Sequence, residues 1–268
     1  MRTKNVVLAL CALAALAIAS AAAQAQSAAP GATKSRLHRV LESGVLRVGT
    51  TGDFRPMSFR DAKTNEYAGH DIEVARELAK DLGVKLEIVP TEWKTLISGI
   101  QTDKYDVAMS GISMNVDRAK VAAFTVPYME FGTVPVVRRK DVGKFKGWND
   151  LDKPNVIIAT TLGTVFDQQA KEYFKRAKRK QVEAPALSYQ EVLAGRAEAC
   201  ITSNVEAASL VQTYPQLAIV PVDRARSRRP ASLLVAQDDL VWLNFLNQWI
   251  TMKRSSEFFD GLQKKWLQ

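Results

Sequence analysis

The stretch YAGHDIEVARELAKDLGVKLEIVPTEWKTLISGIQTDKYDVAMSGIS, residues 67–113, alternates helix-like and strand-like segments and decides the fold class. Its first segment has an apolar stripe at helical spacing that stops at Gly83 and is formed by Ile72, Val74, Ala75, Leu78, Ala79 and Leu82. Residues 84–90 then place apolar side chains at every second position and stop at Pro90, as expected of a strand. This part of the chain is therefore predicted to form a helix followed by a strand.

The segments on either side extend the same alternation. Residues 44–51 have the pattern of a strand, and residues 91–104 have that of a helix with Thr91 as its N-cap. Residues 105–113 have the pattern of a short buried strand that ends in a turn containing Gly111. Strands and helices in this order predict a parallel sheet covered by helices.

The alternation breaks at an apolar extended segment, residues 132–139, and a second α/β set follows it. A further apolar extended segment, residues 217–222, is expected to return the chain, and residues 238–267 have helical spacing. We therefore predict an α/β fold of two lobes, each a sheet flanked by helices, joined by two hinge crossings. The expected parts are residues 36–131 and 223–268 for lobe 1, and residues 132–222, with hinge strands at both ends, for lobe 2.

Residues 1–25 have the order of a secretory signal peptide: basic residues, an uninterrupted apolar stretch, then small residues around Ala23. The apolar stretch is shorter than the roughly 20 residues that a membrane-spanning helix needs. We therefore expect cleavage, export to the periplasm and a mature protein that is not embedded in the membrane. Removal of Cys11 would leave Cys200 alone, in an apolar segment, as a buried structural thiol.

The composition is that of a globular protein, 47% hydrophobic and 24% charged, with a formal net charge of +9. Basic residues cluster at residues 171–180 and 224–229, a balance that suits nucleic acid, anionic lipid or an anionic solute. Export and the scarcity of aromatic residues in these clusters argue against nucleic acid. We expect the first cluster to form the outer face of a solvated helix. His38 and His70 are the two histidines of the sequence and lack metal-ligand spacing, so neither a metal site nor a cofactor is expected.

Three segments carry a family resemblance: residues 46–61, residues 67–129 and the LGT of residues 162–164. Together they resemble the periplasmic solute-binding proteins of the polar amino-acid type, family 3 of the bacterial extracellular solute-binding proteins. The resemblance implies two lobes that close on a ligand by hinge motion, a monomer, and an inner-membrane ABC permease as partner. Residues 41–54 and 106–128 also resemble the cyclohexadienyl dehydratases, exported enzymes with the same fold.

Arg118 resembles the arginine with which this family holds the carboxylate of its ligand. A guanidinium offers a planar pair of donors that matches two carboxylate oxygens. The preceding turn, with Ser110, Gly111 and Ser113, would add backbone N–H groups. Gly163 and Thr164 resemble the contact from the second lobe, where free amides at a helix start attract an anion.

By the same resemblance, an aromatic wall in lobe 1 would contain Phe54, His70 and Trp93. His70 stands where the family usually has another aromatic residue, and an imidazole can both stack on a ligand and form a hydrogen bond with it. A plain structural pair with Asp71 is the alternative for this histidine.

Two positions depart from the family pattern. Amino-acid binders place an aspartate for the ligand's ammonium group where this chain has Ser203 or Asn204, and Glu206 is expected to point elsewhere. A buried cation without a counter-charge costs several kcal/mol. The ligand is therefore expected to be a small carboxylate, an amino acid or a related keto, hydroxy or aromatic acid, that need not carry an ammonium group.

The second departure concerns catalysis. The dehydratases are expected to use a glutamate as general acid where this chain has Phe166, which cannot donate a proton and is expected to contact the ligand instead. Asp167 lies one residue further, rotated by about 100° on a helix, and leaves a rearranged acid open. The sequence thus favours a non-enzymatic binding protein with no catalytic residue, and a dehydratase with an altered general acid is the alternative.

Overall fold

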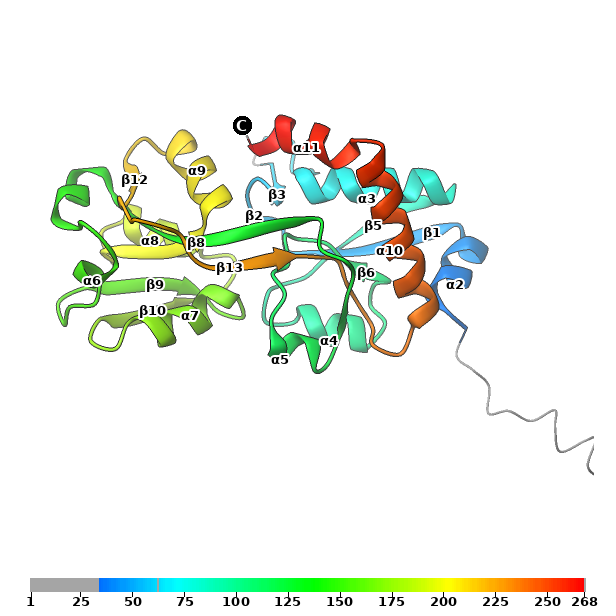
Figure 1. Ribbon diagram of the computed structural model, residues 1–268, viewed down its shortest axis with the longest axis horizontal. Helices are drawn as coiled ribbons and strands as arrows, with labels where there is room; N and C mark the ends of the chain where they lie inside the picture. The colour runs from blue at the N-terminus through cyan, green and yellow to red at the C-terminus, as the bar shows by residue number, and fades with distance from the viewer. Residues whose placement is uncertain (1–33, 62, 268) are drawn as a thin grey trace, which may run out of the picture. The chain divides into compact units, whose positions relative to one another are not determined.

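Two β-sheets flanked by helices organise the chain into two lobes, as the sequence predicts (Figure 1). The computed structural model describes residues 34–61 and 63–267, so the predicted signal peptide, residues 1–25, lies outside the described residues. Within the described part of the chain, no helix is both long enough and apolar enough to cross a bilayer.

The sheet of lobe 1 has the strand order β5-β1-β6-β14-β7. Strand β1 runs parallel to both of its neighbours, β5 and β6, whereas β14 is antiparallel to β6 and β7. These strands are β1 (Val45–Thr50), β5 (Lys85–Pro90), β6 (Val107–Ala108), β7 (Ala123–Phe124) and β14 (Leu234–Val235). A small antiparallel sheet at the edge of the lobe contains β2 (Asp53–Phe54), β3 (Ser58–Arg60) and β4 (Tyr67–Ala68).

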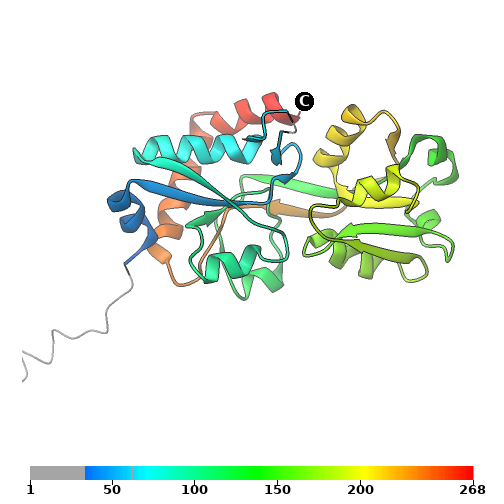
Figure 2. The ribbon, with the colours of Figure 1, turned by 180° about the vertical axis from the view of Figure 1, so that it is seen from behind.

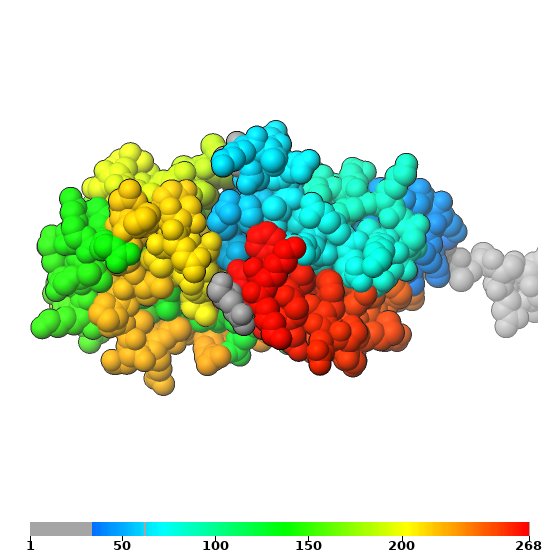
Figure 3. Space-filling model, turned by 90° about the horizontal axis from the view of Figure 1, so that it is seen from above, coloured from blue at the N-terminus to red at the C-terminus, as the bar shows by residue number. Residues whose placement is uncertain are grey.

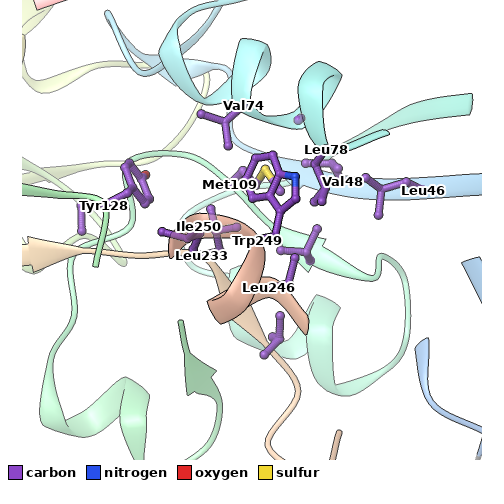
Figure 4. Close-up of a cluster of buried hydrophobic side chains, with 14 of the residues drawn as sticks. Leu46, Val48, Val74, Leu78, Met109, Tyr128, Leu233, Leu246, Trp249 and Ile250 are labelled. Carbon is purple, nitrogen blue, oxygen red and sulfur yellow. The ribbon is translucent and has the colours of Figure 1, made fainter. Parts of the chain in front are cut away.

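Within residues 34–61 and 63–267, the helices of lobe 1 are α2 (Arg36–Ser43), α3 (His70–Leu82), α4 (Leu96–Gln101), α5 (Val116–Ala119), α10 (Leu240–Ser255) and α11 (Phe258–Leu267). The α3 helix ends as predicted at Gly83, whose left-handed conformation suits glycine. Buried side chains of α3, β1 and α10 meet in one hydrophobic core, which includes Val48, Leu78 and Trp249 (Figure 4). Figure 3 shows the surface of α11 in red, beside that of α3.

The sheet of lobe 2 has the strand order β10-β9-β11-β8-β12, and β13 also pairs with β8. Its strands are β8 (Met129–Arg138), β9 (Ile157–Thr161), β10 (Lys178–Val182), β11 (Ala199–Ser203), β12 (Leu217–Ile219) and β13 (Arg226–Ala231). The helices are η1 (Arg139–Lys144), α6 (Trp148–Leu151), α7 (Val165–Tyr173), α8 (Ser188–Leu193) and α9 (Asn204–Thr213). Cys200 is a free, buried thiol in β11.

The chain crosses between the sheets along β8 and returns along β13, which runs antiparallel to it (Figures 1 and 2). The sequence prediction placed the return at residues 217–222, but Leu217–Ile219 forms β12, an edge of the lobe 2 sheet. The apolar residues of this segment are buried against lobe 2 itself. The return falls instead on a basic segment that sequence periodicity does not mark as a strand.

Two other elements differ from the prediction. The helix expected to carry the basic cluster ends at Tyr173, and Lys178–Val182 forms β10, the edge strand next to β9. The predicted C-terminal helix is two helices, α10 and α11, separated at Glu257, whose φ is +57°. A positive φ of this kind interrupts a right-handed helix.

Candidate ligand-binding site

A small cavity lies where side chains of both lobes meet. Its volume is about 20 Å³, enough for about one water molecule. The lining residues from lobe 1 are Asp53, Phe54 and Trp93, and those from lobe 2 are Thr161, Thr164, Phe166, Leu187, Ser188, Tyr189, Ile201, Thr202 and Glu206. A ligand of amino-acid size therefore needs the lobes to separate before it can enter.

Glu206 lines this cavity, contrary to the expectation that it points elsewhere. Ser203 is the N-cap of α9 and its Oγ accepts the Glu206 N–H at 3.0 Å, which places Glu206 in the first turn of the helix. Its carboxyl accepts a hydrogen bond from the Thr202 hydroxyl. The spacing Ser203-x-x-Glu206 has the form of a capping box, which assigns Glu206 to the first turn of a helix but does not reveal that its carboxyl reaches the cavity.

A second carboxyl, that of Asp53, lines the same cavity from lobe 1 and accepts the Trp93 Nε1–H at 2.9 Å. Burial raises the pKa of Glu206 to about 8, with a further contribution from the negative charge of Asp53, whereas the Thr202 hydroxyl opposes the rise. Burial also raises the pKa of Asp53, against the hydrogen bonds from Thr51 and Trp93. The cavity therefore holds two acidic groups that gain stability from a proton or from a cation.

Neither Ser203 nor Asn204 presents its side chain to the cavity. Ser203 is fully buried and caps α9, as described above. The Asn204 Oδ1 accepts the backbone N–H of Gly132 in β8, at 2.8 Å. The chain thus lacks an aspartate at this point, but it has the carboxyl of Glu206 three residues after Ser203, in the first turn of α9.

Arg118 is buried beside the cavity, between the two lobes. Its Nη1 donates to the Ser113 carbonyl at 3.1 Å, and its Nη2 donates to the Gly163 carbonyl at 3.0 Å. Its guanidinium also lies 5.8 Å from the centre of the Trp93 ring. Burial lowers the pKa of Arg118 to about 10, with a smaller contribution from the charge of Arg229, so the side chain stays charged at neutral pH. The structure thus places a desolvated cation at the junction of the lobes.

The turn before Arg118 is held from lobe 1. The Ser110 Oγ lies 2.7 Å from the Thr51 Oγ1, and the Gly111 N–H donates to the Asp71 Oδ2 at 2.6 Å. Gly111 has a φ of +61°, and a Cβ there would lie 2.9 Å from both Phe54 and Met57, so a side chain does not fit. Ser110 and Gly111 consequently set the position of the turn, and the Ser113 carbonyl sets that of Arg118.

On lobe 2, Thr164 is the N-cap of α7: its Oγ1 accepts the Asp167 N–H at 3.3 Å and donates to the Thr161 carbonyl at 2.6 Å. Gly163 has a φ of +83°, and a Cβ there would lie 2.6 Å from the Lys94 nitrogen of lobe 1. The backbones of the two lobes therefore touch at Gly163, directly beside the start of α7.

Two side-chain pairs also join the lobes near the cavity. The Lys94 Nζ lies 2.5 Å from the Glu183 Oε2, and the Gln168 Nε2 donates to the Asp117 Oδ2 at 2.8 Å. Both pairs are solvent-exposed. Such contacts contribute little individually, but together with Arg118 they fix how the lobes meet around the cavity.

An aromatic wall is present in part. Phe54 packs edge-on against Trp93, with ring centroids 5.8 Å apart, and its ring centroid lies 6.3 Å from that of Phe166 of lobe 2. All three residues line the cavity. These rings offer an apolar surface to a ligand that enters between the carboxyls and Arg118.

His70 does not belong to this wall. It is fully buried inside lobe 1, with its Nδ1 2.9 Å from the Asp71 Oδ1 and its ring stacked on Tyr128 and Phe259. Asp71 in turn accepts the Tyr128 hydroxyl at 2.7 Å as well as the Gly111 N–H. The side chain therefore takes the structural alternative, because the start of α3 faces the core and not the cavity.

Asp167, the candidate for a rearranged acid, is committed to lobe 2. Its Oδ1 accepts the Thr160 hydroxyl at 3.0 Å and the Gln181 amide at 2.8 Å, and its Oδ2 lies 3.1 Å from the Lys171 Nζ. It is not among the residues that line the cavity. Of the acidic groups that sequence reasoning considered, the structure brings Glu206 to the cavity.

Comparison with known proteins gives a consistent family match. A model of the bacterial extracellular solute-binding proteins, family 3, matches residues 46–268. The chain is similar to cyclohexadienyl dehydratase of Pseudomonas aeruginosa, with 32% identity over 242 residues, 90% of this chain and 90% of that protein.

Two solved structures are similar as well. One is an ancestral amino acid-binding protein described as a precursor of cyclohexadienyl dehydratase, with 37% identity, a TM-score of 0.82, and coverage of 87% of this chain and 100% of that one. The other is a variant of arginine-bound ArgBP from T. maritima, with 29% identity, a TM-score of 0.74, and coverage of 81% of this chain and 99% of that one.

Proposed function

The chain belongs to family 3 of the bacterial extracellular solute-binding proteins, and we propose that it carries a small amino acid to an inner-membrane ABC permease. It does so after export, as a monomer released from the predicted leader at residues 1–25. The ligand lies between the two lobes, which open to admit it and close around it. No step of this function needs a cofactor.

The observation that carries the proposal is that two carboxyls line a cavity between the lobes and a buried guanidinium, which contacts Gly163 next to the lining residue Thr164, lies beside it. Arg118 offers a buried guanidinium for a carboxylate, and the start of α7 at Thr164 adds the positive end of a helix. Glu206 and Asp53 offer carboxyls for an ammonium group. An amino acid carries both of the complementary charges, which is why we prefer it to other small carboxylates.

The sequence left an amino acid and its ammonium-free relatives open as ligands, and it favoured a carboxylate without an ammonium group. That expectation depended on the absence of a counter-charge near Ser203, and Glu206 supplies one. Similar chains support the change, since one solved neighbour is arginine-bound and another is named an amino acid-binding protein. Keto and hydroxy acids become the comparison ligands.

A thermal-shift series of matched pairs tests the ligand class: L-amino acids, and the keto or hydroxy acids with the same side chains. A ligand at a hundred times its Kd stabilises a protein by about 2.7 kcal/mol. We expect shifts from one or a few amino acids and none from their ammonium-free partners, and Glu206→Gln should weaken the response. Equal shifts from both members of a pair would refute the role given to the two carboxyls.

A second function is favoured by one specific observation, the buried carboxyl of Glu206. Because its pKa is raised to about 8, this carboxyl is largely protonated at neutral pH. A protonated acid facing an aromatic cavity can donate to a departing hydroxyl, which the dehydratase alternative requires and Phe166 cannot provide. In this alternative the substrate would be prephenate or arogenate.

Incubation of the purified protein with prephenate separates the two functions. The binding proposal predicts no phenylpyruvate above background, with either the wild type or Glu206→Gln. The dehydratase alternative predicts that the wild type converts prephenate, that Glu206→Gln does not, and that Asp167→Asn still does. That result would establish the dehydratase activity and identify Glu206 as its general acid.

A further inference from the structure

The two basic clusters noted in the sequence, at residues 171–180 and 224–229, come together on lobe 2. The Arg226 guanidinium lies 4.6 Å from the centre of the Trp148 ring and 5.2 Å from that of Tyr173, near the end of α7. The Tyr173 hydroxyl donates to the hydroxyl of Ser227. These contacts bring the start of β13 beside the segment that leads from α7 into β10.

This junction gathers cations that form no close ion pair within the part of the chain that the structure describes, although the charge of Arg176 acts on nearby Asp152. Among the described residues, no carboxylate lies at ion-pair distance from six of them, which we call the basic face: Lys175, Arg176, Lys178, Arg179, Arg224 and Arg226. All of them except Arg226 are exposed. Lys178 and Arg179 are successive residues of the edge strand β10 and lie on its two sides, so this part of the basic face follows the open edge of the sheet. The nearby Asp152 accepts the backbone N–H groups of Arg176 and Ala177 and holds that turn in place. Apart from Arg226, which packs on Trp148 and Tyr173, the basic face is thus a set of solvated charges beyond what the fold uses internally.

The composition of the basic face indicates what kind of partner fits it. Specific protein interfaces have an apolar centre rich in aromatic residues, but the exposed large apolar side chains of the described residues all lie in or beside helices of lobe 1: Leu41, Val116, Val121, Leu240, Val241 and Met252. Binding of single-stranded nucleic acid uses exposed rings for base stacking, whereas Tyr173 is covered by Arg226. A face of charge without apolar or stacking anchors fits a diffuse anionic surface.

We propose that the basic face binds the anionic headgroups of a phospholipid bilayer, by electrostatic attraction and without insertion. Each basic residue near such a surface strengthens binding by roughly fivefold, and the attraction falls off within about one Debye length. The binding is independent of the ligand cavity. It would concentrate an exported protein at the membrane that contains its permease.

Lysine and arginine on an edge strand such as β10 also have a purely protective role, since they prevent pairing with other chains. This role accounts for Lys178 and Arg179, but it does not account for Lys175, Arg176 and Arg224, which lie outside the strand. The two explanations differ in what they predict for lipid binding.

The test is co-sedimentation with vesicles of phosphatidylglycerol and phosphatidylcholine, compared with phosphatidylcholine alone. The protein is purified from a bacterial host that exports it, so that its N-terminus is processed as in nature. We expect binding to the anionic vesicles only, with a steep loss as salt rises. The triple variant Lys175→Glu, Lys178→Glu, Arg179→Glu should bind at least about a hundredfold less tightly, since the loss of three positive charges alone accounts for that factor.

A matched control makes the same change of net charge on lobe 1, through Lys85→Glu, Lys104→Glu and Lys264→Glu, three exposed residues without ion pairs among the described residues. It should retain most of the binding. If both variants lose the same affinity for anionic vesicles, the effect comes from the overall charge of the protein and the proposal is overturned. Wild-type binding that is no stronger to anionic than to neutral vesicles would overturn it as well. Should the triple variant not fold, Lys175→Ala and Arg179→Ala should each still weaken binding by roughly fivefold.

Discussion

Replacing Glu206 with glutamine should change how the stability of the protein depends on pH. The Glu206 carboxyl is buried at the cavity that Asp53 also lines, and it accepts a hydrogen bond from the Thr202 hydroxyl. Its pKa rises from an ordinary value of 4.5 to about 8 on folding. Glutamine has nearly the same shape but carries no proton that can titrate near neutral pH.

The sign and size of this pH dependence follow from how many protons the folded and the unfolded protein bind. Between about pH 4.5 and pH 8, the folded protein keeps a proton that the unfolded chain has released, so the free energy of unfolding falls as the pH rises. The stabilisation from this proton is fully present below the pKa of Glu206 in the unfolded chain, and it is lost as the pH rises through the pKa of Glu206 in the folded protein. For the values above, the wild type should lose about 3 kcal/mol from this group between pH 5.5 and pH 8. The glutamine variant should lose none of it.

Urea unfolding followed by tryptophan fluorescence, at half-unit steps across this range, measures the effect. The free energy of Glu206→Gln minus that of the wild type should increase by about 3 kcal/mol from pH 5.5 to pH 8. Glu66→Gln, at an exposed position, controls for the loss of one formal charge. If the curves of the wild type and Glu206→Gln run parallel, then Glu206 is not desolvated and the account of the cavity given above is wrong.

Three further substitutions test other contacts. Arg118→Lys removes the paired donors that reach Ser113 and Gly163, so the Kd measured by calorimetry should rise at least about tenfold; an unchanged Kd would contradict the carboxylate grip. Gly163→Ala strains a left-handed residue by about 1–2 kcal/mol and forces the lobes apart at Lys94. Both the Tm of the protein and its affinity for the ligand should therefore fall. Retention of both would show that the lobes need not touch at this position. Tyr128→Phe removes a donor to the buried Asp71 and should cost about 1–3 kcal/mol in urea unfolding, with no cost if a water molecule replaces the hydroxyl.

Much of the fold could be predicted because local periodicity and tertiary burial agree in lobe 1. The stripe of α3 and its stop at Gly83 face the core as the 3.6-residue period requires. Sequence periodicity fails to predict a strand whose residues are neither apolar nor alternately apolar and polar. Arg226–Ala231 forms a crossing strand because it pairs with β8, a long-range contact that its own composition does not encode. Lys178–Val182 pairs with β9 for the same reason.

The sequence indicated the local setting of Arg118, a short helix after a glycine-containing turn, and the structure has it there between the lobes, while its role in binding stays a prediction. The site was not predictable where the direction of a side chain decides the outcome. His70 and Glu206 both lie in the first turn of a helix, yet one faces the core and the other faces the cavity. The rotation of each helix about its axis depends on packing against elements distant in sequence, which the residues beside it do not reveal.

The strand order of lobe 1 has a consequence for how the protein is made. Strand β14, residues 234–235, lies between β6 and β7, so the lobe 1 sheet is incomplete until nearly the whole chain is present. Helices α10 and α11, which fill its core, come later still. In lobe 2, every strand and helix lies between residues 129 and 231. Chain order thus keeps lobe 1 unfinished during synthesis, a property that suits the export proposed above, because a translocation channel accepts an unfolded chain.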